Sequence, residues 1–162
     1  MSKRLWALSL FVCVIFFSAV TSFAVDIPRL SKNAEGQIAR LPIQFNGRVK
    51  PFESFTRETL EIVTGSPSIG NRSPVLTVLN MIAHPEKWEN VEILSVPYRP
   101  LQKELGLSPK QTHTSYQGLF AAGFMKWLPP IVAKEAASEK LTFLEQETMD
   151  LYNRFTVLHG IF

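Results

Sequence analysis

Three basic residues lie close together in one part of the sequence. Arg48 and Lys50 occupy alternate positions, so their side chains share one face of an extended strand, and Arg57 follows in the next segment. Guanidinium and ammonium groups bind carboxylates, propionates and acidic protein surfaces. These residues are therefore a candidate binding or interface site. The alternative is ordinary ion pairing within the domain.

The carboxylates offer a second and weaker site. Glu53, Glu58 and Glu61 form the densest acidic group, and the last two share one face of a helix, as acid–base catalysis of a hydrolase would need. A solvated helix face is the more common role of such residues. The sequence contains no Gly-x-Ser-x-Gly turn and no phosphate-binding glycine loop. We therefore expect no catalytic residues and no enzymatic activity.

The histidines lack the spacing of a metal site. His84, His113 and His159 are too far apart for the i, i+3 or i, i+4 patterns of metal ligands. His159 is the best-placed candidate for a haem ligand if its helix end meets a membrane partner, and a surface histidine is the alternative. Cys13 is the single cysteine, so covalent haem attachment through Cys-x-x-Cys-His is excluded. We expect this chain to bind no metal and no cofactor.

The N-terminus has the composition of an export signal. Lys3 and Arg4 precede an uncharged run over residues 5–25, and small residues permit a cleavage that removes 1–24 as a signal peptide. The run is also long enough to span a bilayer, so an uncleaved N-terminal anchor is the alternative. Either way, residues 25–162 are expected in the periplasm, at the outer face of the cytoplasmic membrane.

The charge balance argues against a nucleic-acid partner. The formal net charge is +3, and loss of Lys3 and Arg4 with the leader lowers it to +1. Proteins that bind nucleic acid non-specifically carry a much larger basic surface.

The middle of the chain predicts a β-hairpin. Asn46-Gly47 is typical of a type I′ turn, because both central residues of that turn have positive φ, and short strands are predicted at 42–45 and 48–51. Residues 25–40 are polar and irregular, which indicates a linker or a loosely held arm.

Helical periodicity follows the hairpin. A helix over 52–64 is predicted, with Arg57 and Glu61 paired on its exposed side. A short strand is expected at 91–97, and further helices at 101–107, 115–127 and 130–137. In the helix predicted over 52–64, the residues expected to be buried are Phe52, Phe55, Thr59, Ile62 and Val63. A second helix begins at Ser73-Pro74, and its predicted buried face is Val75, Leu76, Leu79 and Ile82.

The last segment, residues 141–162, carries one continuous apolar stripe at helical spacing. Its end is almost entirely apolar, whereas chain ends are usually polar. We expect this edge to dock against a partner through Leu151, Phe155, Leu158 and Phe162.

Together these elements predict a single extracytoplasmic domain over 41–162. Its expected class is helix-dominated α+β, with a small N-terminal β-hairpin followed by about five helices.

The block at 41–52 (LPIQFNGRVKPF) resembles the P-V-Q-x-x-G-R-x-K-P stretch of system II cytochrome c biogenesis proteins, the CcsA/CcsB and ResC/ResB class. Residues 55–65 (FTRETLEIVTG) are similar to the T-x-x-x-E-x-L-x-x-[IV]-[TS]-G pattern that follows it. Residues 78–88 (VLNMIAHPEKW) resemble a later V-x-L-G-M-x-x-x-P-x-x-W segment. The similarity extends over about residues 41–162, and the Gly-Arg-x-Lys-Pro block is its most specific part.

The resemblance implies an extracytoplasmic region without the transmembrane haem-handling part of that family. It implies a non-enzymatic accessory or scaffold module of c-type cytochrome maturation. Its implied partners are a multispanning membrane protein that delivers haem and, in addition, apocytochrome c. Haem would be bound by that membrane protein and not by this chain. An exported binding protein for a small anionic ligand such as haem is the alternative function, and it would use the basic hairpin.

Overall fold

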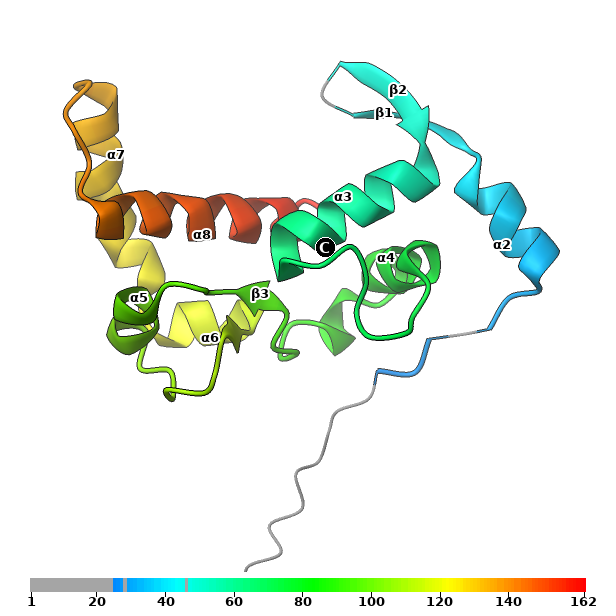
Figure 1. Ribbon diagram of the computed structural model, residues 1–162, viewed down its shortest axis with the longest axis horizontal. Coiled ribbons are helices and arrows are strands. Elements are labelled where there is room, and N and C mark those ends of the chain that lie inside the picture. The colour runs from blue at the N-terminus through cyan, green and yellow to red at the C-terminus, as the bar shows by residue number, and fades with distance from the viewer. Residues whose placement is uncertain (1–24, 28, 46) are drawn as a thin grey trace, which may run out of the picture.

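The computed structural model describes residues 25–27, 29–45 and 47–162 (Figure 1). The predicted signal peptide over 1–24 lies outside the described residues. Seven α-helices and two small antiparallel sheets occur in the described part of the chain, which confirms the helix-dominated α+β class. None of the helices described there is long and apolar enough to cross a membrane.

The hairpin has the predicted bounds. Strand β1 (Pro42–Phe45) pairs antiparallel with β2 (Arg48–Pro51), and Phe45 lies opposite Arg48 at the turn. Gly47 has a φ of 74°, which glycine adopts at little cost because it has no Cβ. Asn46 lies outside the described residues.

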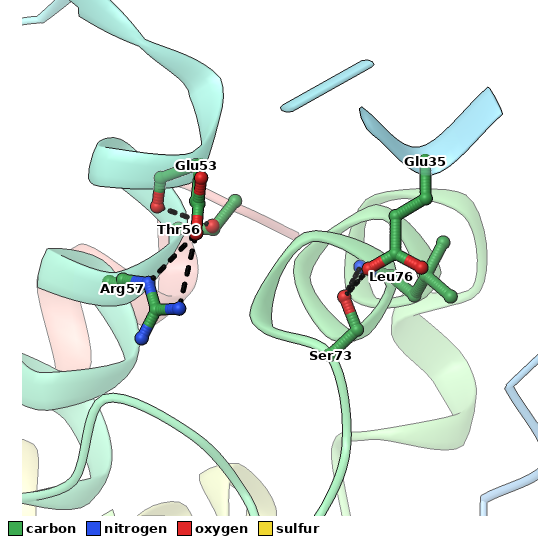
Figure 2. Close-up of polar contacts among 6 residues, drawn as sticks. All are labelled: Glu35, Glu53, Thr56, Arg57, Ser73 and Leu76. Carbon is green, nitrogen blue, oxygen red and sulfur yellow. Dashed lines mark hydrogen bonds and ion pairs between the residues drawn. The ribbon is translucent and has the colours of Figure 1, made fainter. Parts of the chain in front are cut away.

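Helix α2 (Lys32–Ala39) occupies much of the segment predicted to be an irregular linker, so that prediction is wrong here. Ser31 caps the helix by accepting a hydrogen bond from the Ala34 amide. Ile38 packs against the hydrophobic core. The Ser73 hydroxyl donates a hydrogen bond to Glu35, which ties α2 to the start of α4 (Figure 2). The apolar contacts of Ile38 and Ala39, together with the cap, hold a helix that is too polar to show periodicity.

Helix α3 (Phe52–Thr64) has the predicted bounds and ends at Gly65, whose φ of 77° is left-handed. Its buried stripe differs from the predicted one, because Ile62 is 37% exposed. The predicted pair of Arg57 with Glu61 is wrong. Arg57 instead pairs with Glu53 one turn earlier, with the acid N-terminal to the base, which is the favourable order (Figure 2). The buried residues of α3 are Phe52, Thr56, Thr59, Leu60 and Val63.

Helix α4 (Pro74–Ala83) begins at the predicted Ser73 cap, but it buries a different face from the one predicted. Val75, Val78 and Met81 lie in the core, whereas Ile82 is 49% exposed. The helix is apolar on both sides, so its periodicity cannot show which side faces the core. Packing against α3 determines which side of α4 is buried.

A short second sheet follows the 3₁₀ turn η1 (Pro85–Lys87). Strands β3 (Leu94–Ser95) and β4 (His113–Thr114) pair antiparallel, so the strand predicted at 91–97 is shorter than expected. Trp88 is completely buried, and its indole N–H donates a hydrogen bond of 2.9 Å to the Asn80 side-chain oxygen. This bond satisfies the polar atom of the largest core side chain.

The remaining short helices differ from the predicted ranges. Helix α5 (Arg99–Glu104) starts earlier than the predicted helix at 101–107. The helix predicted over 115–127 is interrupted at Gly123, whose φ of 69° separates α6 (Tyr116–Ala121) from η2 (Phe124–Trp127). Helix α7 (Leu128–Ala136) has proline in its first turn, where a missing amide hydrogen costs nothing.

Helix α8 (Phe143–His159) runs across the centre of the molecule (Figure 1). Thr142 and Glu145 form a capping box at its start, in which each side chain binds the other's backbone amide. The helix packs against α3, α5, α7 and β3. It is therefore the central element of the core.

Candidate interaction surface

The hairpin β1–β2 projects from one end of the molecule, beyond the start of α3 (Figure 1). One side of it packs on α3, where the rings of Phe45 and Phe55 meet edge to face at 5.1 Å between centroids. The other side faces solvent. Val49 on that side is 73% exposed, and Leu41 just before the hairpin is also exposed.

Lys50 lies on the side of the hairpin that faces α3. Its ammonium group forms an ion pair with Glu58 and lies 5.3 Å from the centre of the Phe45 ring. The carboxylate and the negative face of the ring both attract the ammonium group. This contact fastens the hairpin to α3.

Arg57 also has a carboxylate partner on its own helix. Its Nε and Nη2 atoms lie 3.2 and 3.1 Å from one Glu53 carboxylate oxygen (Figure 2). The three cations of the predicted basic cluster therefore differ in their surroundings. Arg48 is exposed at the turn and forms no ion pair with any residue that the structure describes.

Two of the three glutamates of the weaker candidate site lie together. Glu53 and Glu58 are exposed members of the two ion pairs. Glu58 and Glu61 both line a shallow hollow of about 740 Å³ between α3, β3 and α8, together with Asp150 and Arg154. Arg154 donates a hydrogen bond of 3.1 Å to the Ser95 carbonyl there. This hollow was not predicted from the sequence, although Asp150 and Arg154 are one turn apart on α8.

The docking edge predicted on the last helix is wrong. Leu151, Phe155 and Leu158 are buried in the core, and Phe162 is half-buried against it. The stripe faces α3 and the rest of the domain, so three of its four residues are not available to a partner. An apolar stripe shows that a helix face is covered, but the sequence does not show what covers it.

His159 belongs to an aromatic cluster at the end of α8. Its Nδ1 atom lies 2.9 Å from the Tyr116 hydroxyl, and its ring is nearly parallel to those of Tyr116 and Phe155. The histidine itself is exposed. Its role as a haem ligand stays a prediction.

The other two histidines make local contacts. His113 Nε2 lies 3.1 Å from the Thr64 carbonyl, and His84 Nδ1 lies 3.6 Å from a Glu86 carboxylate oxygen. Across the part of the chain that the structure describes, no group of three histidine, cysteine or acidic residues could hold a metal ion.

The perturbed charges lie at the start of α8. The Lys134 ammonium group lies 2.6 Å from a Glu145 carboxylate oxygen, and this hydrogen bond lowers the pKa of Glu145 to about 2, with further help from Thr142. The same contact raises the pKa of Lys134. Glu145 stabilises the start of α8, and Lys134 binds it from α7.

Comparison with known proteins gives one informative match. No protein-family model matches the chain. A stretch of 64 residues, which is 40% of this chain, is 33% identical to protein NrfI of Wolinella succinogenes. The matched stretch is 7% of the length of NrfI, so this chain corresponds to a small part of that relative.

Proposed function

We propose that this protein is a non-enzymatic scaffold module of c-type cytochrome maturation. The match to NrfI carries the proposal, because it supports a link to cytochrome c maturation. The resemblance of residues 41–52 to the system II class points in the same direction. The proposed location is the periplasm, at the outer face of the cytoplasmic membrane.

The position of that block in the fold supports a contact role. Residues 41–52 form the hairpin and the first residue of α3, and this hairpin projects from the domain (Figure 1). Arg48 and Val49 are both exposed near the turn, with the cationic side chain on the Lys50 face of β2 and the apolar side chain on the opposite face. Interfaces commonly combine these two kinds of contact. The proposed partner is a multispanning haem-delivery protein, with apocytochrome c as a further partner.

Two features of the glutamates support the non-enzymatic part of the proposal. Glu53 and Glu58 are held in exposed ion pairs, and the hollow that Glu58 lines is shallow, whereas acid–base catalysis favours an enclosed pocket. Haem is proposed to reach the complex through the partner and not through this chain.

Binding of a small anionic ligand such as haem by the hairpin has less support. Lys50 and Arg57 would have to leave Glu58 and Glu53 before they could bind an anion. A haem titration followed by absorbance tests this alternative. A Soret band that disappears in the variant Arg48→Ala/Lys50→Ala would favour it over the scaffold role.

The scaffold role is tested in a deletion strain whose exported proteins are stained for covalent haem. Holocytochromes c should be lost and then restored by this chain. The variant Arg48→Ala/Val49→Ser should restore them poorly while it accumulates normally. The control is Lys110→Ala/Val132→Ser, which removes one exposed cation and one exposed valine away from the hairpin and should restore them fully. Normal haem staining in the deletion strain would overturn the proposal.

A further inference from the structure

We propose that the outer face of helix α4 lies on the lipid surface of a membrane. The proposal rests on the membrane location given above and adds which face of the domain meets the bilayer. The contact surface consists of Leu79 and Ile82 on α4 and of Ile27 and Leu30 in the segment before α2.

Helix α4 is apolar on two opposite sides. Its inner side is covered by the core, where Val78 and Met81 have no exposed surface. On its outer side, Leu76 and Leu79 are half-buried and Ile82 is 49% exposed. The segment before α2 and α2 itself cover this side only in part, so Ile82 stays open to a cover from outside the domain.

The N-terminal segment extends this apolar side. Leu30 is 42% exposed and lines a shallow groove of about 210 Å³ with Ile27, Leu76 and Leu79. Ala83 also lines it, and Asn80 and His84 are the polar residues among the described lining. No aspartate, glutamate, lysine or arginine is among the described residues that line the groove. Such a surface favours lipid or another apolar environment over water.

The route of the chain favours lipid as the occupant when residues 1–24 are retained as the N-terminal anchor. Val25 and Ile27 pack against the core and lie beside Leu76, so the described chain begins on the same side as the outer face of α4. The preceding residues 5–24 carry no charge and are long enough to enter a bilayer. A bilayer that holds this run would bring its surface next to Val25 and hence next to α4.

Basic residues beside the groove fit the same surface. Arg29 and Arg72 line an adjoining hollow with Asp26, which leaves an excess of one positive charge there. Arginine near a membrane surface keeps its guanidinium among the headgroups while its aliphatic part covers apolar surface. Anionic headgroups attract such cations.

The test uses the full chain with residues 1–24 retained, in the background Cys13→Ser, reconstituted in phosphatidylglycerol–phosphatidylcholine vesicles. One fluorophore is attached at Ile82→Cys and, in a separate control, at Val132→Cys. These two positions are similarly exposed, at 49% and 43%, but lie on α4 and α7. Spin-labelled lipid quenches from the bilayer, and iodide quenches from water.

We expect lipid quenching at position 82 to be at least about twofold stronger than at position 132, since an interfacial helix enters the headgroup boundary. Equal lipid quenching at the two positions would overturn the proposal. Protection of position 82 from both quenchers would also overturn it, because a protein or a second copy would then cover the face. Haem staining of the deletion strain is a separate readout, so failure of lipid contact and failure of the scaffold role are distinguishable.

Discussion

The hairpin and helix α8 both carry residues that the sequence marks as candidates for contact, but they lie in opposite environments. The hairpin projects from the domain with Val49 73% exposed, whereas α8 is central and its residues Leu151 and Leu158 have no exposed surface. The two regions therefore respond differently to substitution. We expect changes in α8 to act on folding, whereas changes on the outer side of the hairpin should leave the fold intact and act on the proposed contact.

The comparison also separates two kinds of charge contact. The pairs at the hairpin and on α3 are exposed and fasten local elements, and exposed pairs contribute little to stability. The Lys134–Glu145 pair joins α7 to the start of α8, where Glu145 is also a member of the capping box. We therefore expect pH to affect the helix start more than the hairpin.

The largest expected effect is that of Leu158→Ala in α8. Removing this fully buried side chain should lower the free energy of unfolding by about 2–5 kcal/mol, because apolar contacts are lost and a cavity remains. Urea denaturation followed by circular dichroism measures the change. A loss under about 1 kcal/mol with impaired partner binding would instead make this residue part of an interface.

A smaller effect is expected for Thr142→Ala at the start of α8. The side chain caps the helix by accepting a hydrogen bond from the Glu145 amide, so its removal should cost about 0.5–2 kcal/mol of unfolding free energy. Thr156→Ala in the same helix is the control, because that hydroxyl only donates to the Tyr152 carbonyl. Equal losses in the two variants would show that the cap has no special role.

The third prediction concerns pH. The pKa of Glu145 is lowered from 4.5 to about 2 in the folded protein, so its stabilising contribution is present above pH 4.5 and is lost as the pH falls toward 2. The melting temperature of Glu145→Gln should therefore lie below that of the wild type at neutral pH. This difference in melting temperature should disappear as the pH falls from 4.5 to about 2. A constant gap down to pH 2 would contradict this cause.

The smallest effect on stability is expected for Val49→Thr on the outer side of the hairpin. The side chain is exposed, and threonine is also well suited to strands, so the free energy of unfolding should change by less than about 0.5 kcal/mol. Chemical denaturation measures this value. A loss of several kcal/mol would show that the hairpin belongs to the folding core and would remove the contrast with α8.

Local sequence signals predicted the element bounds well where a single residue type decides them. The Asn46-Gly47 pair predicted the bounds of both strands. Gly65 predicted the end of α3, and Ser73-Pro74 predicted the start of α4. Helix α2 was not predicted, because its main apolar contact, through Ile38, joins it to the rest of the fold. The break at Gly123 was also missed, since a glycine inside an apolar segment does not always end a helix.

The candidate site was predicted only in part. The sequence placed Arg48 and Lys50 on one strand, and the antiparallel register confirms that strand. It did not predict the partners Glu58 and Glu53, because ion pairs between elements depend on how a strand and a helix meet. The hollow between α3, β3 and α8 was missed for the same reason, since its residues come from three separated segments.

The sequence by itself determined the hairpin, the bounds of α3 and the helix-dominated class, because turns, caps and prolines act through neighbouring backbone. Only the tertiary structure decided which apolar faces are covered. It buried Leu151 and Leu158, which the sequence assigned to a partner, and it exposed Ile82, which the sequence assigned to the core. The physical reason is that the hydrophobic effect has no direction, so an apolar stripe requires a cover but does not specify which one.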